Sequence, residues 1–359
     1  TISALGFRVC EPVARLLGSL WRLRRQAGWP TDAANRVGYA ELLLRCAVML
    51  GKLMTFAPQM DGLQRVGLLV QALGRLGGLP EGPSIARAFF GVGASYLGHP
   101  IVAGWTRELP PRPVGGPRLQ AEVDMGRVVL DLGTGHWDGS ADRMTALVPA
   151  FAALGSDREL MEAASVSAKI CFYQGRLLES RERFRGLRHL GGGLFGTVWL
   201  AWAHLGEADA SQVLGDADTD ELEGLLRSAH QQIDEAQSID NAYTLRCQGL
   251  AARIALRRGD LDGLREAVST GIASMRQAPR RGFWAHEGYA GLAEGLAELT
   301  GRTDASGRHP ELEAMWKALD ASLAGHALRF VRGAGVLHRV RALRALARGH
   351  RSAEAARPR

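Results

Sequence analysis

Apolar residues recur along much of the chain with the period of an α-helix. One such stripe precedes the turn at 256–263 with the spacing i, i+4, i+8, i+11 and i+15, and consists of Ile239, Tyr243, Cys247, Leu250 and Ile254. This spacing places all five side chains on one helix face. A similar stripe runs through 336–347, and no convincing series of alternating strands occurs. The pattern therefore predicts a helical protein.

Short glycine-containing turns separate these helical stretches. Their key glycines are Gly98, Gly135, Gly175, Gly206, Gly259, Gly301 and Gly349. The gaps between them average about 42 residues, which is within the range of two-helix repeats. A helix pair cannot bury its apolar face alone, whereas stacked pairs bury a continuous core. We therefore expect an all-α fold, a right-handed α-solenoid of about seven or eight helix pairs.

Three polar segments break the repeat pattern. They lie at 108–118, 206–224 and 301–311, and are rich in Pro and Gly, in small acidic residues, or in polar residues. We expect them to be loop insertions between helices. The region 36–359 is then one repeat array, and 1–35 forms a linker helix region that the pattern does not place.

The stretch VVLDLGTG at 128–135 is similar to the first motif of a nucleotide-fold methyltransferase. Two observations favour a helix instead. Ala121, Met125, Val128, Val129 and Leu132 form a helical stripe that begins well before the motif. The second acidic strand that such a fold requires roughly 20 residues later is missing. We expect 128–132 to be helical.

Arginine supplies almost all of the positive charge, since only Lys52, Lys169 and Lys317 are lysines. The net charge is +7 and the pI is about 9.7. A nucleic-acid partner is therefore admissible, but the charge does not require one. Four cysteines lie far apart, each within an apolar helical run: Cys10, Cys46, Cys171 and Cys247. We interpret them as buried free thiols in a reducing, cytoplasmic compartment.

Three local motifs carry a resemblance to a known family. They are Gly135-His-Trp137, Leu154-Gly-Ser-Asp157 and Tyr173-Gln-Gly175, and segments 256–263 and 286–299 add to them. These motifs resemble the C-terminal tetratricopeptide-like repeat region of large bacterial signalling ATPases. In that family, a cyclase or Ser/Thr kinase domain precedes an AAA-type ATPase, and the repeats follow. The resemblance implies a repeat fold in a signal-transduction setting, and it supplies no catalytic residues.

Catalytic and cofactor motifs are missing from the sequence. It contains no G-x-x-x-x-G-K-[ST] phosphate loop, no kinase set and no H-E-x-x-H pair. We therefore expect no catalytic, cofactor-binding or metal-binding residues in this chain, and no cofactor. The expected function is a protein-interaction scaffold whose partner is a protein, a peptide or an adjacent domain of the same polypeptide. No segment is predicted to span a membrane.

Aromatic residues gather on the helices predicted to come first in each pair. The candidate partner-binding residues are Trp199, Trp202, Tyr243, Trp284 and Tyr289. First helices line the concave groove of tetratricopeptide-like arrays, where aromatic side chains hold peptides. Ordinary packing between helices is the other interpretation, and the spacing favours it.

The C-terminal run 329–359 holds nine arginines and one acid, Glu354. One interpretation is a patch that binds nucleic acid, which makes an arginine-rich solenoid that binds nucleic acid the alternative function. The other is the polar face of amphipathic repeat helices, which is the interpretation that we favour.

Overall fold

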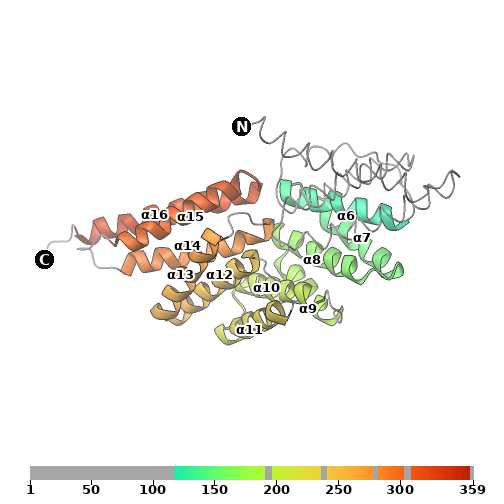
Figure 1. Cartoon of the computed structure of the whole chain (residues 1–359), viewed down its shortest axis with the longest axis horizontal. Coiled ribbons are helices and arrows are strands. Elements are labelled where there is room, and N and C mark those ends of the chain that lie inside the picture. The colour runs from blue at the N-terminus through green and yellow to red at the C-terminus, as the bar shows by residue number, and fades with distance from the viewer. Residues whose placement is uncertain (1–116, 191–195, 236–240, 278–281, 303–308, 356–359) are drawn as a thin grey trace, which may run out of the picture. The chain divides into compact units, whose positions relative to one another are not determined.

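A computed structural model describes residues 117–190, 196–235, 241–277, 282–302 and 309–355 (Figure 1). These ranges contain eleven α-helices, one short 3-10 helix and no strand, which confirms the prediction of an all-α protein. The first six helices are α6 Pro117–Thr134, α7 Ser140–Ala153, α8 Asp157–Tyr173, α9 Leu177–Leu190, α10 Gly196–Leu214 and α11 Thr219–Glu235. The remaining elements are α12 Asn241–Arg258, α13 Leu261–Gln277, η1 Phe283–Ala285, α14 His286–Arg302, α15 Pro310–Ala327 and α16 Val331–Ala355.

The chain divides into two compact units, of which one comprises 1–95 and 101–127 and the other 96–100 and 128–359. Only residues 117–127 of the first unit are described, whereas most of the second unit is described. Several predictions fall outside the described residues: the linker region 1–35, the turn at Gly98, the thiols of Cys10 and Cys46, and segment 108–116. Cys171 and Cys247 are buried free thiols, as predicted.

Helix pairs follow one another at a regular interval in the second unit. The turn glycines that follow α10 and α12, Gly215 and Gly259, lie 44 residues apart, and α14 and α16 begin at His286 and Val331, 45 residues apart. Each of α10, α12, α14 and α16 contacts the preceding even-numbered helix. The helices α10, α12 and α14 also contact the odd-numbered helices on either side of them in sequence. The colour gradient of Figure 1 follows this succession from green at α8 to red at α16.

Even-numbered and odd-numbered helices differ in burial. Thirteen of the 17 residues of α8 and twelve of the 17 residues of α14 are buried. In contrast, four of the 17 residues of α11 and five of the 18 residues of α15 are buried. The even-numbered helices α8 and α14 are therefore surrounded by other helices, whereas α11 and α15 bury one stripe and present the rest to solvent.

Three predicted turn glycines end helices as expected. Gly135, Gly175 and Gly259 have φ of 84°, 77° and 70°, in the left-handed region that side chains with a Cβ disfavour. At Gly175, the amide of Arg176 bonds back to the carbonyl of Cys171 at 2.9 Å, which closes the end of α8. The local sequence therefore identified these turns correctly.

The other described turn glycines were predicted wrongly. Gly206 lies inside α10, Gly301 in the last turn of α14 and Gly349 inside α16. A Cβ at Gly206 would lie about 2.5 Å from ring atoms of Phe184, so this glycine makes room for a side chain of α9. The turn after α10 is at Gly215, whose φ is 77°. A glycine that permits close packing and a glycine that permits a turn are alike in sequence.

The predicted insertion at 206–224 is also wrong, because α10 continues to Leu214 and α11 begins at Thr219. Its small residues misled the interpretation: Ala208 and Ala210 are buried, and they allow close contact between helices. Within the predicted insertion at 301–311, residues 301–302 end α14 and 310–311 begin α15, and 303–308 are not described.

The stretch 128–132 is helical, as predicted, because it lies within α6. Val128, Val129 and Leu132 are buried there, and the indole of Trp137 donates to the carbonyl of Leu132 at 3.2 Å. The hydrogen bond holds the turn against the helix end, and no strand for a nucleotide fold exists at this position.

At one place two helices approach so closely that their backbones touch. A Cβ on Gly249 of α12 would lie 2.6 Å from the Cα of Gly288 in α14, and a Cβ on Gly291 would meet the backbone of Gly249. Side chains at these positions would force the two helices apart. The glycines therefore allow α12 and α14 to touch along their backbones.

Candidate functional site

Four ionisable side chains are buried on consecutive even-numbered helices. Lys169 on α8 is 1% exposed, Asp209 on α10 5%, Arg246 on α12 3% and Glu287 on α14 8%. Lysine, arginine and carboxylate side chains are almost never fully buried unless they are paired. We call these four residues the buried charge cluster.

Ion pairs join the members of the buried charge cluster. The Nζ of Lys169 lies 3.0 Å from the Oε2 of Glu287 and 3.6 Å from the Oδ2 of Asp209. The guanidinium of Arg246 donates to the same Oδ2 of Asp209 at 2.6 Å. One connected set of charges therefore links α8, α10, α12 and α14, although their sequence positions span more than 100 residues.

Burial and neighbouring charges shift the protonation of this cluster. Burial lowers the pKa of Lys169, against the opposing attraction of Glu287, and the nearby charge of Arg246 lowers it further. Burial alone would raise the pKa of Glu287, but the charges of Lys169, Arg332 and Arg246 outweigh it, and that pKa is lowered. Burial is thus the main cause for Lys169, whereas for Glu287 the three neighbouring cations outweigh burial.

The third cation acting on Glu287 is Arg332, at the start of α16. Its guanidinium lies 4.0 Å from the ring centroid of Tyr173 and 5.6 Å from that of Phe172. Within the part of the chain that the structure describes, no hydrogen bond or ion pair joins Arg332 to another residue, and its buried Nε has no acceptor. The hydroxyl of Tyr173 is buried without a hydrogen-bond partner as well. Arg332 therefore carries the excess positive charge.

The structure brings together four of the five candidate aromatic residues. The ring centroid of Trp202 lies 5.5 Å from that of Trp199, 6.4 Å from that of Tyr243 and 5.5 Å from that of Trp284. Trp284 is partly exposed and the other three are buried. Interlocked aromatic rings of this kind stabilise a core. Their role in binding a partner stays a prediction, and it applies most directly to Trp284.

Tyr289, the fifth candidate, lies elsewhere in the core. Its hydroxyl is 2.9 Å from the Oγ of Ser322, and its ring centroid is 5.3 Å from that of His326. The Nε2 of His326 is in turn 2.9 Å from the Nδ1 of His286. Burial and then the neighbouring His326 lower the pKa of His286 well below its usual value, so His286 is uncharged at neutral pH.

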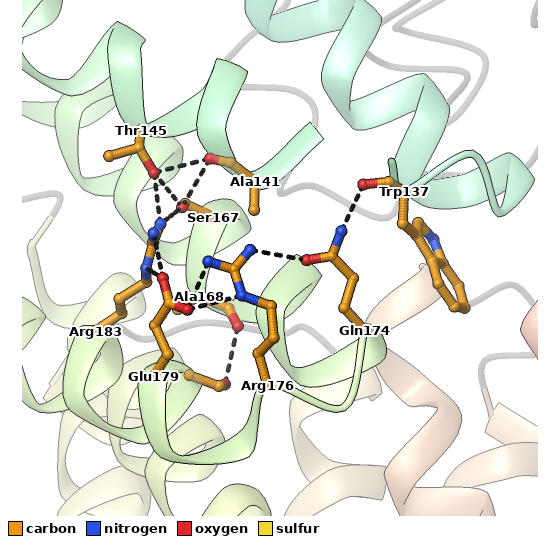
Figure 2. A network of polar contacts seen from close by, with 10 residues as sticks. Trp137, Ala141, Thr145, Ser167, Ala168, Gln174, Arg176, Glu179 and Arg183 are labelled. Atoms are coloured by element: carbon orange, nitrogen blue, oxygen red, sulfur yellow. Dashed lines mark hydrogen bonds and ion pairs between the residues drawn. The ribbon is translucent and has the colours of Figure 1, made fainter. Parts of the chain in front are cut away.

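A second polar network joins α7, α8 and α9 (Figure 2). The guanidinium of Arg183 contacts Ser167 and Thr145, and both hydroxyls also donate to the carbonyl of Ala141, at 3.3 and 2.8 Å. Figure 2 shows Gln174 reaching the carbonyl of Trp137, at 2.7 Å. These bonds fix the turn after α8 against the start of α7, so the network has a structural role.

Three of the C-terminal arginines are paired with acids of the same molecule. Arg339 donates to Glu294 at 2.6 Å, Arg341 to Asp320 at 2.8 Å and Arg344 to Glu313 at 2.8 Å. These bonds tie α16 to α14 and α15. These three arginines therefore fit the interpretation that they form the polar face of a repeat helix. Their charges are largely neutralised by carboxylates within the fold.

Sequence reasoning missed the buried charge cluster, although a signal was present. Lys169 lies in the apolar stretch VSAKICF, and Arg246 lies among the apolar positions of the stripe around Tyr243 and Leu250. A charge on an apolar face requires a partner, because an unpaired buried charge is costly. Such positions could have been marked from the sequence, but their partners could not.

No group of three or more metal-ligating side chains occurs among the described residues. In the same ranges, no helix has both the length and the apolar character required to cross a membrane. No protein-family model matches the chain, and no curated protein sequence matches it. The interpretation of the site therefore rests on its geometry.

Proposed function

We propose that the chain is a non-catalytic protein-interaction scaffold, a right-handed solenoid of tetratricopeptide-like helix pairs. The observation that carries the proposal is the succession of helix pairs from α10 to α16 at intervals of 44 to 45 residues, in which even-numbered helices are packed side by side. In such arrays each repeat is held by its neighbours, and the array offers a long surface to partners. The partner is a protein, a peptide or another domain of the same polypeptide.

The proposed setting is a cytoplasmic, bacterial signal-transduction ATPase, on the strength of the motifs around Trp137, Leu154 and Tyr173. A repeat region in such a protein regulates the attached cyclase, kinase or ATPase domain. The reading frame that encodes the chain tests this setting. It should encode a phosphate-loop ATPase on the same polypeptide, and a frame without one contradicts the setting while leaving the scaffold proposal untouched.

Binding of nucleic acid is the alternative function, and the pairing of the α16 arginines weighs against it. A protein that neutralises phosphates needs cationic side chains that are free to meet them. Arg339, Arg341 and Arg344 already meet carboxylates in the same molecule. Transfer to phosphates would leave Glu294, Asp320 and Glu313 unpaired, so this surface is a poor phosphate-binding surface.

Fluorescence anisotropy separates the two functions. The purified chain is titrated into a labelled DNA duplex and a labelled single-stranded RNA, at low and at physiological salt. A scaffold should bind neither at physiological salt. Binding that persists there and weakens steeply with added salt, as counterion release requires, would favour the alternative function.

A further inference from the structure

An unpaired arginine and exposed apolar side chains lie at one corner of the second unit. Arg332 follows Val331, which is 63% exposed, and Leu328, which is 87% exposed, lies in the turn between α15 and α16. Val331 also packs near Gly135, since a Cβ on that glycine would lie 3.6 Å from the Cγ1 of Val331. The corner thus joins the turn after α6 to the start of α16.

Aromatic rings pack against Arg332 at this corner. The ring centroid of Tyr173 is 5.5 Å from that of the partly exposed Trp137, and the guanidinium of Arg332 stacks on the Tyr173 ring. We call Trp137, Tyr173, Leu328, Val331 and Arg332 the Arg332 corner. Tryptophan, tyrosine and arginine are the residue types that dominate binding energy in protein interfaces.

The electrostatics of the Arg332 corner specify the charge of its ligand. Lys169 and Arg246 use the two carboxylates of the buried charge cluster, and Arg332 is left without one. Beneath it, the Tyr173 hydroxyl is a buried donor without an acceptor. A carboxylate from outside would meet an arginine whose charge is not neutralised and whose guanidinium is already oriented by stacking.

From this geometry we infer that the Arg332 corner binds an acidic side chain of a partner protein, carried on a segment whose neighbouring apolar side chains cover Leu328 and Val331. The inference rests on the proposed scaffold function and names the partner's chemistry. An acidic group alone would leave the two exposed apolar side chains uncovered, and an apolar segment alone would leave Arg332 without an acceptor. An acidic segment with apolar neighbours satisfies both.

A random peptide display library, selected on the intact chain, tests the inference. Selected peptides should carry Asp or Glu next to apolar residues, and Arg332→Gln should weaken their binding by about ten-fold or more, as for a central interface arginine. Arg332→Lys should restore part of the binding. Arg341→Gln is the matched control, because Arg341 lies on the same helix but is paired with Asp320, and it should leave binding unchanged.

A second pair of variants tests the inference without changing Arg332, in case Arg332→Gln does not fold. Leu328 is almost fully exposed, so Leu328→Asp and Leu328→Lys should both fold. Both variants lose the apolar contact, but the aspartate should weaken binding of the acidic peptides more than the lysine does, since only the aspartate repels the ligand. Equal effects of the two variants would overturn the inference.

The remaining outcomes separate this inference from the scaffold proposal. Peptides that bind with the same affinity to the Arg332→Gln variant would overturn the Arg332 corner and leave the scaffold function standing. Selected peptides without acidic residues would do the same. Failure to select any peptide, together with tight binding of DNA or RNA, would overturn both.

Discussion

Arginine–carboxylate pairs occur in two settings in this protein, buried among the even-numbered helices and exposed to solvent, as between α15 and α16. Arg246 and Asp209 form a pair in which neither side chain is more than 7% exposed, whereas in the pair of Arg341 and Asp320 the side chains are 53% and 31% exposed. The geometry is similar, with contacts of 2.6 and 2.8 Å. Only the surroundings differ, and they decide what the removal of one partner does.

The largest effect should follow removal of a buried carboxylate. Asp209→Ala leaves Arg246 without its carboxylate and Lys169 with only Glu287, and we expect a loss of about 3–5 kcal/mol of unfolding free energy. The control is Asp320→Ala, which removes the exposed pair and should change stability too little to measure. Urea denaturation of both variants gives the comparison. Equal losses would mean that burial does not distinguish the two pairs.

Two glycines allow a buried and an exposed position to be compared through their packing. Gly206→Ala on α10 places a methyl group against the ring of Phe184, which should cost about 1–3 kcal/mol by overpacking. Gly186→Ala on the exposed face of α9 meets nothing within 4 Å. That change should stabilise the protein by about 0.5–1 kcal/mol, because alanine favours a helix. Thermal unfolding should therefore shift in opposite directions, and shifts of the same sign would contradict this packing.

Substitution of a turn glycine tests the backbone conformation separately from side-chain packing. Gly175 has a φ of 77° and no neighbour that a Cβ would meet. Gly175→Val should therefore cost about 1–2 kcal/mol or more through backbone strain alone, a penalty that Gly175→Asn should largely avoid. Chemical denaturation measures both variants. If the asparagine variant loses as much stability as the valine variant, the cause is not the left-handed conformation.

The buried histidine should make stability depend on pH. The pKa of His286 is lowered in the folded protein, so between that pKa and about 6.5 the unfolded chain binds more protons. Stability should therefore fall as the pH is lowered from 7 to 5, by up to about 1.4 kcal/mol per pH unit. The lowered pKa of Glu287 adds a loss in the same direction below about pH 4.3.

Unfolding midpoints at pH 5, 6 and 7 measure this dependence. His286→Asn should reduce it above pH 5, because the histidine with the most strongly lowered pKa is removed. Burial also lowers the pKa values of His204 and His230, so part of the slope should remain. The control is His338→Asn on the exposed part of α16, which should leave the slope as it is. An unchanged slope in the His286 variant would place its origin in other groups.

How far the sequence could predict this protein depends on the range of each interaction. Helical stripes and the turns at Gly135, Gly175 and Gly259 are local, and they were predicted correctly. Gly206 and segment 206–224 were not, because their small residues serve contacts with other helices, and such contacts leave no local pattern. The pairs of the buried charge cluster join residues that lie 37, 40 and 118 positions apart. Its partners depend on how helices are placed in register, which a single sequence does not determine.

The partner-binding role of the five aromatic residues rested on a general property of repeat arrays rather than on their own neighbours. Burial of Trp199, Trp202, Tyr243 and Tyr289 is compatible with packing. Arg332 was not singled out, because one arginine among nine in the run has no distinguishing sequence signal. Its lack of an acceptor becomes visible only in the structure, where Arg339, Arg341 and Arg344 of the same helix meet carboxylates.

The glycine contact between α12 and α14 has a mechanical consequence. Where Gly249 meets Gly288 and Gly291, the joint contains no rotamers that could adjust under load, so it should resist shear more than a joint filled only by flexible side chains. We expect the two helices to move as a single stiff segment when the array bends. Elastic deformation would then concentrate at joints made of side chains, such as that between α10 and α12. A partner that binds both ends of the array would therefore bend it mainly at those softer joints.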